Sequence, residues 1–177
     1  MRVRIPSSAQ IKNKMYNFKT ATNSPIDILE HIAVQKARHG KNLKVHVGTD
    51  SASREGLLHY YLVVAFRYST NGAHFVFHKE KVPIFRHGND KPDIFRKLMR
   101  EAELSILFCE KIVQNNLLER GQIILEMDYN GVKETMSTEL ISYAKGWAVG
   151  LGYNVITKNE KIHAQMAVKA ANFLSQS

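Results

Sequence analysis

The chain has 177 residues, of which 44% are hydrophobic, and a formal net charge of +9. This length suits one domain with a substantial core and a short extension. The sequence contains no run of about 18 apolar residues, and its first ten residues lack the apolar middle of a signal peptide. We therefore expect a cytoplasmic protein without a membrane-spanning helix.

The single cysteine, Cys109, lies in an apolar helical pattern. One thiol excludes a disulfide within the chain and a zinc site made of clustered thiols. We expect Cys109 to be part of the core.

The positive charge is concentrated at the start of the chain. Residues 1–44 hold nine Lys or Arg against two acidic residues, whereas residues 45–177 hold sixteen against fourteen. Such a basic segment would be attracted to a polyanion, and nucleic acid is the commonest one in the cytoplasm. A lysine-rich surface that only keeps the protein in solution explains the charge equally well.

Residues 1–23 show no sustained hydrophobic period and are predicted to form an extended arm. Residues 24–40 are predicted to form a helix, because Ser24 can cap it, Pro25 fits its first turn and Asp27 follows the cap by three residues. Gly40 is expected to end this helix.

Three strands are predicted next, at residues 43–51, 59–69 and 73–85. The turn residues STNG at 69–72 join the second strand to the third, so the three strands should form an antiparallel meander. Residues 86–93 are a polar loop, in which Asp90 or Asp93 can start a long helix over residues 94–115.

The remaining pattern alternates strands and helices. A fourth strand is predicted at residues 123–130, a helix at 135–150, a short strand at 153–158 and a last helix at 163–174. A strand that follows a helical crossover ordinarily runs parallel to an earlier strand of the same sheet.

Two predicted strands end in aspartate, Asp50 on the first and Asp128 on the fourth. If these strands are parallel neighbours, both carboxylates lie at the carboxyl edge of the sheet, where α/β proteins commonly bind ligands. Their repulsion must be offset by a shared proton or by a cation. Oxygen ligands alone suit Mg²⁺ or Mn²⁺. The alternative is that each aspartate only stabilises a turn.

Three short motifs in this order resemble the ribonuclease H-like superfamily: GTDS at 48–51, AELS at 102–105 and MDYN at 127–130. The stretches VGTDS and NGVKETMSTELISYAKGWAVGLGYNVITK look most similar to the YkuK-type ribonuclease H-like family of predicted nucleases. The similarity covers roughly residues 43–175. It predicts a ribonuclease H-like domain at 43–177, preceded by a basic arm and helix at 1–42.

The resemblance implies an α/β fold with a five-stranded mixed sheet, its first three strands antiparallel, and helices on both faces. It also implies a Mg²⁺ or Mn²⁺ site. Carried over position by position, Asp50 would bridge two metal ions, Glu103 would be the helix carboxylate and Asp128 the carboxylate of the fourth strand. Glu101 is the alternative helix ligand.

The last helix departs from the family pattern. Asn172 falls where active members usually have aspartate, and no acidic residue follows Glu160. Asparagine offers a neutral oxygen, which should weaken one metal site. His163, just before this helix, matches a histidine that shuttles protons in some relatives; a surface histidine at a helix start is the simpler explanation.

A group of basic residues around the third strand and the long helix is a candidate contact for a phosphate backbone, and a solvated surface explains it equally well. Its members are Lys79, Lys81, Arg86, His87, Lys91, Arg96, Lys97 and Arg100. The sequence thus predicts a metal-dependent phosphodiesterase, a nuclease acting on RNA, DNA or an RNA/DNA hybrid. The alternative is a nucleic-acid-binding module with weak or no hydrolytic activity.

Overall fold

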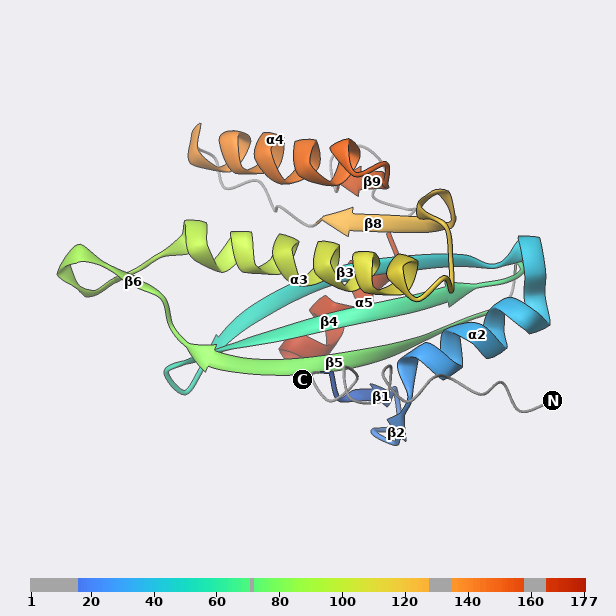
Figure 1. Cartoon of the computed structure of the whole chain (residues 1–177). Coiled ribbons are helices and arrows are strands. Elements are labelled where there is room, and N and C mark those ends of the chain that lie inside the picture. The colour runs from blue at the N-terminus through green and yellow to red at the C-terminus, as the bar shows by residue number, and fades with distance from the viewer. Residues whose placement is uncertain (1–15, 71, 128–134, 158–164) are drawn as a thin grey trace.

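In the computed structural model of the protein, the described residues are 16–70, 72–127, 135–157 and 165–177. Their main feature is a sheet of seven strands (Figure 1). The strands are β1 (Phe18–Thr20), β2 (Pro25–Ile26), β3 (Lys44–Arg54), β4 (Leu57–Arg67), β5 (Ala73–Pro83), β8 (Ile123–Met127) and β9 (Asn154–Thr157). Across the sheet they lie in the order β2-β1-β5-β4-β3-β8-β9.

The centre of the sheet has the predicted connectivity. Strands β3, β4 and β5 form an antiparallel meander, and β8 pairs with β3 in parallel. Strand β9 continues the sheet in parallel with β8. The predicted mixed α/β sheet with an antiparallel first half is therefore confirmed.

The predicted number of strands is wrong, because β1 and β2 extend the sheet beyond β5. The five expected strands are its consecutive part from β5 to β9. Strand β1 belongs to the segment that was expected to be an extended arm. Its Phe18 is fully buried and contacts Phe108, and this burial holds three residues of the segment in the sheet.

In the described part of the chain, four α-helices accompany the sheet. They are α2 (Ile28–His39), α3 (Ile94–Gln114), α4 (Thr135–Gly150) and α5 (Ala167–Gln176). A small two-stranded ribbon, β6 (Arg86–His87) and β7 (Lys91–Pro92), precedes α3 where a loop was expected. In the described part of the chain, no helix is both long and apolar enough to cross a membrane.

The starts of α2 and α3 follow from capping side chains. Asp27, not Ser24, caps α2, because its Oδ1 accepts the backbone N–H groups of Leu29 and Glu30. Pro25 lies in β2 and not in the first helical turn. Asp93 caps α3 and accepts the N–H of Arg96, which confirms one of the two predicted starts.

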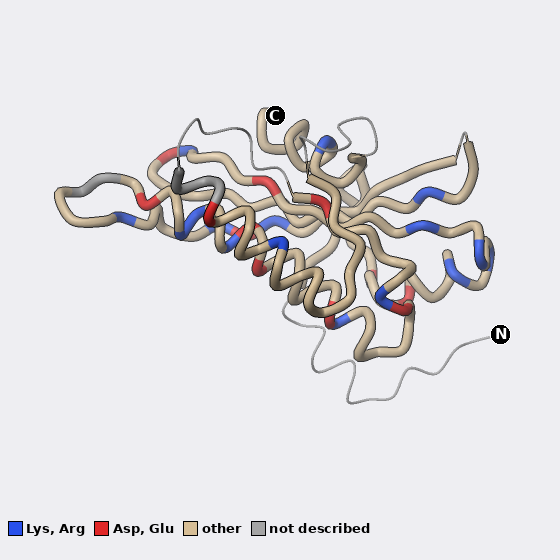
Figure 2. The backbone as a smooth tube through the Cα atoms, turned by 90° about the horizontal axis from the view of Figure 1, so that it is seen from above, with Lys and Arg blue, Asp and Glu red and all other residues tan. Residues whose placement is uncertain are grey.

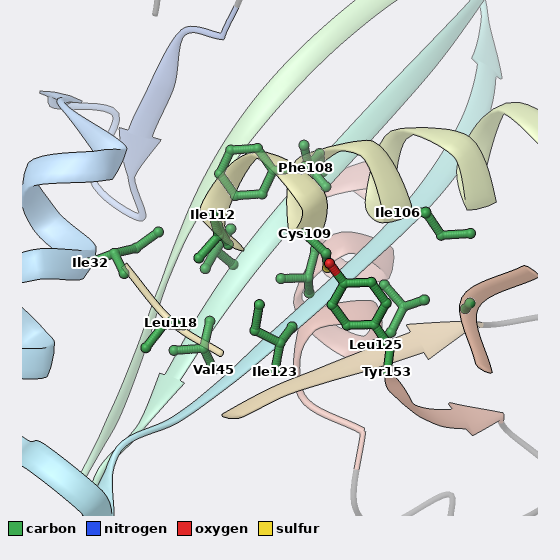
Figure 3. Packing of buried hydrophobic residues seen from close by; sticks show 14 of the residues in the cluster. Ile32, Val45, Ile106, Phe108, Cys109, Ile112, Leu118, Ile123, Leu125 and Tyr153 are labelled. Carbon is green, nitrogen blue, oxygen red and sulfur yellow. The ribbon is translucent and has the colours of Figure 1, made fainter. Parts of the chain in front are cut away.

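The larger hydrophobic core joins α2, α3 and α4 to one face of the sheet. In Figure 3, Cys109 and Ile112 of α3 lie over Val45 of β3 and over Ile123 and Leu125 of β8. The predicted core position of Cys109 is confirmed, and its burial raises the pKa of the thiol well above the usual value.

Helix α5 packs on the opposite face of the sheet, behind β3 and β4 in the view of Figure 1. The apolar cluster there is much smaller. Its buried members are Tyr61, Val63, Ala65, Phe77, Ala167 and Ala171. Helices therefore cover both faces, as the resemblance implied.

Candidate functional site

Asp50 lies near the carboxyl end of β3 and faces α5. Its Oδ2 accepts hydrogen bonds from Asn172 Nδ2 at 3.4 Å and from Ser175 Oγ at 3.2 Å. Asn172 and Ser175 are three residues apart on α5, so both side chains reach the same strand. The half-buried Asp50 is thus brought together with Asn172, the predicted site residue of the last helix.

Gly48 permits the close approach of α5 to β3. A Cβ atom at this position would lie 2.8 Å from Val168 Cγ2 and 3.2 Å from the backbone nitrogen of Val168. Both distances are shorter than ordinary contacts, so any larger residue would push the helix away. The glycine of the GTDS motif therefore sets the distance from Asp50 to the helix.

A buried carboxylate fixes the start of α5. Glu126, on β8, accepts the backbone N–H of Met166 at 2.7 Å and that of Val168 at 2.8 Å. His46 Nδ1 also donates to Glu126 Oε1 at 2.7 Å. The two side chains are 2% and 1% exposed. A negative charge is stabilised at a helix N-terminus, so Glu126 holds α5 on the sheet.

A basic residue holds the other end of α5. Arg54, the last residue of β3, donates hydrogen bonds to the carbonyl oxygens of Ser175 and Ser177. A cation is stabilised beside the last carbonyl groups of a helix. The helix that carries Asn172 is therefore attached to the sheet at both ends.

The opposite face of β3 presents hydroxyl groups to α3. Ser51 Oγ donates to Glu101 Oε1 at 2.5 Å, and the hydroxyls of Thr49 and Ser105 share a hydrogen bond of 2.7 Å. Glu101 is 5% exposed. Successive residues of a strand point to opposite faces, so Asp50 and Ser51 connect β3 to two different helices.

Glu103 lies elsewhere on α3. Its side chain is 43% exposed and forms an ion pair of 2.7 Å with Arg100, which also contacts Glu80 at 3.0 Å. Of the two candidate helix carboxylates, the structure brings Glu101 next to β3 and places Glu103 in a partly exposed charge cluster.

Two predicted site residues, Asp128 and His163, lie outside the described residues. The last residue of β8 is Met127, and Glu126 pairs with Gly48. The carboxyl ends of β3 and β8 therefore lie at the same edge of the sheet, as the parallel arrangement predicts. Among the described residues, no three His, Cys, Asp or Glu side chains lie close enough together to hold a metal ion.

The described donors nevertheless suit a hard divalent cation. On the α5 face of β3, Asp50 supplies carboxylate oxygens and Asn172 an amide oxygen that accepts a hydrogen bond from Gln176, whereas the Glu101 carboxylate lies on the α3 face. A set of oxygen donors without sulfur or imidazole is typical of Mg²⁺ and Mn²⁺ sites.

The predicted basic contacts lie on several elements. Lys79 and Lys81 are exposed on β5, whereas Arg86 is exposed on β6 and Arg96 on the first turn of α3. Arg100 is neutralised by its two glutamates. Lys91 lies on β7, and its side chain is not described. In Figure 2, the Lys and Arg of the described residues are distributed over several elements.

One polar network connects α3 to the residue before β9. Glu110 accepts a hydrogen bond from Tyr153 at 2.5 Å and two from Arg120 at 3.1 and 3.2 Å. Burial raises the pKa of the Glu110 carboxyl, but the hydrogen bonds from Tyr153 and Arg120 outweigh this effect and lower it.

Sequence reasoning missed His46, Glu126 and Arg54. The signal for the first two was a polar residue inside an apolar strand, in VHV and in LEM. Such a residue needs a buried hydrogen-bond partner. Because the two strands were predicted to be parallel neighbours, His46 and Glu126 could have been predicted to be partners.

Comparisons with known proteins agree with this topology. Neither the curated proteins nor the solved structures contained a match. A family model described as Ribonuclease H-like matches residues 27–175, from the cap of α2 into α5. This match covers most of the chain, and the central strand order and the helices on both faces are those the resemblance implied. The protein therefore belongs to the ribonuclease H-like family.

Proposed function

We propose that the protein is a metal-dependent phosphodiesterase that cleaves nucleic acid. The observation that carries the proposal is the position of Asp50 on the central strand, next to Asn172 of α5. On the other face of the same strand end, Ser51 contacts Glu101 of α3. One short stretch of β3 thus collects polar side chains from both helices.

Asp50, Glu101 and Asp128 are the proposed metal ligands, and Asp50 and Glu101 approach β3 from its two faces. Glu101 is preferred over Glu103 because it is buried beside β3, whereas Glu103 is occupied by Arg100. Asp128 follows β8 directly in the sequence, and β8 is the parallel neighbour of β3.

The bound Mg²⁺ or Mn²⁺ would supply positive charge for attack on a phosphodiester and for departure of the leaving oxygen. Hydrogen bonds from the protein's own side chains orient the carboxylates. Asn172 donates to Oδ2 of Asp50, and Ser175 Oγ, which also donates to the carbonyl oxygen of Asn172 at 2.8 Å, lies 3.2 Å from the same oxygen and helps to orient this carboxylate. Ser51 does the same for Oε1 of Glu101. Such preorganisation is what a catalytic site requires.

The test is the Asp50→Asn variant. Labelled RNA, DNA and RNA/DNA hybrid are incubated with wild type and variant in Mg²⁺ and in Mn²⁺, with chelator as the blank. We expect cleavage to fall by about 1000-fold or more, which corresponds to about 4 kcal/mol of barrier. The melting temperature should stay close to that of wild type, and Glu30→Gln, which removes a charge on α2, should retain activity. Metal-dependent cleavage by Asp50→Asn would refute the role of Asp50.

One observation favours a second candidate, a module that binds nucleic acid without cleaving it. Asn172 contributes a neutral amide where a carboxylate would add a charged ligand. The Asn172→Asp variant separates the two functions. If wild type binds labelled nucleic acid without turnover and Asn172→Asp cleaves it in Mn²⁺, the protein is a binding module. If wild type cleaves the nucleic acid and the variant only cleaves it faster, the protein is a nuclease.

A further inference from the structure

A groove of about 1060 Å³ lies beside the C-terminal end of α5. Its lining comes from this end of the helix, from β5 and from the segment around β1 and β2. Asp50, Glu101 and Asn172 are not among the residues that line it. The groove is therefore a surface distinct from the candidate site.

Three lysines line this groove at neighbouring positions of the sheet. Lys79 and Lys81 are two residues apart on β5. Lys19 of β1 is opposite Phe77, which is two residues before Lys79. Residues two apart on a strand are about 7 Å from each other and share a face, as do residues that lie opposite each other. The three side chains therefore share the face of α5, because Phe77 and Tyr61, which is opposite Lys79, belong to the apolar cluster under this helix.

The groove has an excess of positive charge. All three lysines are exposed, and none of them forms an ion pair within the described part of the chain. Arg54 adds a fourth cation, whereas Asp27 is the single acidic side chain among the lining residues that the structure describes. Ammonium groups at adjacent positions repel one another, so this arrangement favours an anion that neutralises them.

The distribution of the cations indicates a chain of anionic groups and not a single ion. The lysines lie on two strands, and Arg54 lies at the end of α5, where it donates to the carbonyl oxygens of Ser175 and Ser177. The groove volume of about 1060 Å³ is at the upper end of the range of about 300–1000 Å³ that small-molecule sites occupy. Positively charged grooves of this kind follow the backbone of single-stranded nucleic acids.

Strand β1 supplies one wall of the groove. The match to the ribonuclease H-like family begins at residue 27. Four of the lining residues precede it, namely Tyr16, Asn17, Lys19 and Asn23. The groove is therefore built where the segment before the matched residues joins the sheet of the family.

We propose that Lys19, Lys79 and Lys81 bind the phosphate backbone of one strand of nucleic acid along this groove. This inference deepens the proposed function and rests on it for the class of ligand. Each ammonium group would donate to phosphate oxygens and neutralise their charge. Since contacts to phosphates carry no sequence information, the groove would bind strands of any base sequence.

The test measures binding in the presence of chelator, so that cleavage cannot interfere. The fluorescence anisotropy of labelled single-stranded DNA and RNA is followed over a series of salt concentrations. Wild type is compared with a groove variant, Lys19→Gln/Lys79→Gln/Lys81→Gln. A control variant makes the same change of charge at three exposed lysines that do not line the groove, Lys36→Gln/Lys41→Gln/Lys44→Gln.

For the groove variant we expect the affinity to fall more than about tenfold at moderate salt, and the slope of log affinity against log salt to decrease by about 2. Its melting temperature should equal or exceed that of wild type, because repulsion among the lysines is removed. The control variant should stay within about twofold of the wild-type affinity, because salt screens charges that do not contact the ligand. Changing the same three groove lysines to arginine keeps their charge and should keep the affinity within about threefold of wild type.

The inference is overturned if the groove variant binds like wild type, if the control variant loses as much affinity, or if the arginine variant loses as much as the glutamine variant. Polyglutamate, added as a competitor, provides a further arm. If polyglutamate displaces the labelled strand as well as an unlabelled oligonucleotide of equal charge does, the groove accepts any acidic chain and the inference is overturned as well.

The failure of this inference is distinguishable from failure of the proposed function. If wild type cleaves no nucleic acid while the groove variant loses binding, the groove binds nucleic acid and the protein is not a nuclease. If Asp50→Asn abolishes cleavage while the groove variant binds like wild type, the protein is a nuclease and the groove is not a binding surface for its substrate.

Discussion

The two faces of the sheet are held to their helices by different forces. On the face of α2, α3 and α4, most contacts belong to one large apolar core. On the face of α5 the apolar cluster is small, and charged or hydrogen-bonded groups fix the helix at Glu126, Asp50 and Arg54. Apolar packing is non-directional, whereas hydrogen bonds fix direction and distance.

This difference teaches how the candidate site is built. The large core supplies stability, because burial of apolar surface is the main favourable term in folding. The polar attachments of α5 supply position, because they determine which residue of the helix meets Asp50. Four variants test contacts on the two faces.

The largest effect should come from exchanging the helix carboxylates one at a time. Glu101→Gln should lower metal-dependent cleavage about 1000-fold, because it removes a proposed metal ligand beside β3. Glu103→Gln, the matched control two residues away, should change the rate less than about threefold because its partner is Arg100. Cleavage rates in Mn²⁺ measure both. If Glu103→Gln loses more activity than Glu101→Gln, Glu103 is the helix carboxylate of the site.

The next effect concerns the attachment of α5. Glu126→Gln should lower the free energy of unfolding by about 3 kcal/mol, because His46 and two helix N–H groups lose a buried charged acceptor. Glu139→Gln, at an exposed position of α4, should change it by less than about 0.5 kcal/mol. Urea unfolding monitored by circular dichroism gives both values. Equal stability of the two variants would contradict the anchoring role of Glu126.

A smaller effect tests the close approach of α5. Gly48→Ala should destabilise the protein by about 2 kcal/mol, because the new Cβ overlaps Val168. Gly146→Ala, in α4, meets no atom within 4 Å and should stabilise by up to about 1 kcal/mol through helix propensity. Thermal unfolding compares them. If Gly48→Ala is as stable as wild type, the two elements are not in tight contact.

The smallest effect tests a polar contact on the apolar face. Tyr153→Phe keeps the ring in the core and removes the hydrogen bond to Glu110, at a cost of about 1 kcal/mol near neutral pH. Since the pKa of Glu110 is lowered in the folded state, its contribution is present above its unfolded pKa and is lost as the pH falls through the folded value.

The difference in stability between Tyr153→Phe and wild type should therefore decrease between neutral pH and about pH 3. Urea unfolding at a series of pH values measures it. A difference that is constant with pH would show that the hydroxyl does not act through the Glu110 carboxylate.

Much of the fold followed from hydrophobic periodicity. The meander, the long helix and the parallel return of β8 all have long, regular patterns with clear turn or capping residues, such as Asp93 before α3. Strand β1 has only three residues, too few to show a period, and its place in the sheet depends on the burial of Phe18. A segment of this kind is fixed by tertiary contacts.

The start of α5 was predicted too early for a similar reason. The helix was expected at residue 163 and begins at Ala167. Its first N–H groups are satisfied by Glu126, a residue some 40 positions away in the sequence. No local side chain signals the start, so a local pattern could not locate it. The motif AELS likewise pointed to Glu103, whereas the residue facing β3 depends on the rotation of the packed helix.

The attachments at the two termini of α5 have a consequence for any evolutionary or engineered change in this part of the protein. A glutamate of β8 accepts hydrogen bonds from one end of the helix, and an arginine of β3 donates hydrogen bonds to the other end. Sliding the helix by even one residue would break both contacts at once. The contacts at the two ends of α5 thus determine that residue 172 lies beside Asp50. Residue 172 can therefore be exchanged for other small polar residues without a change in its position.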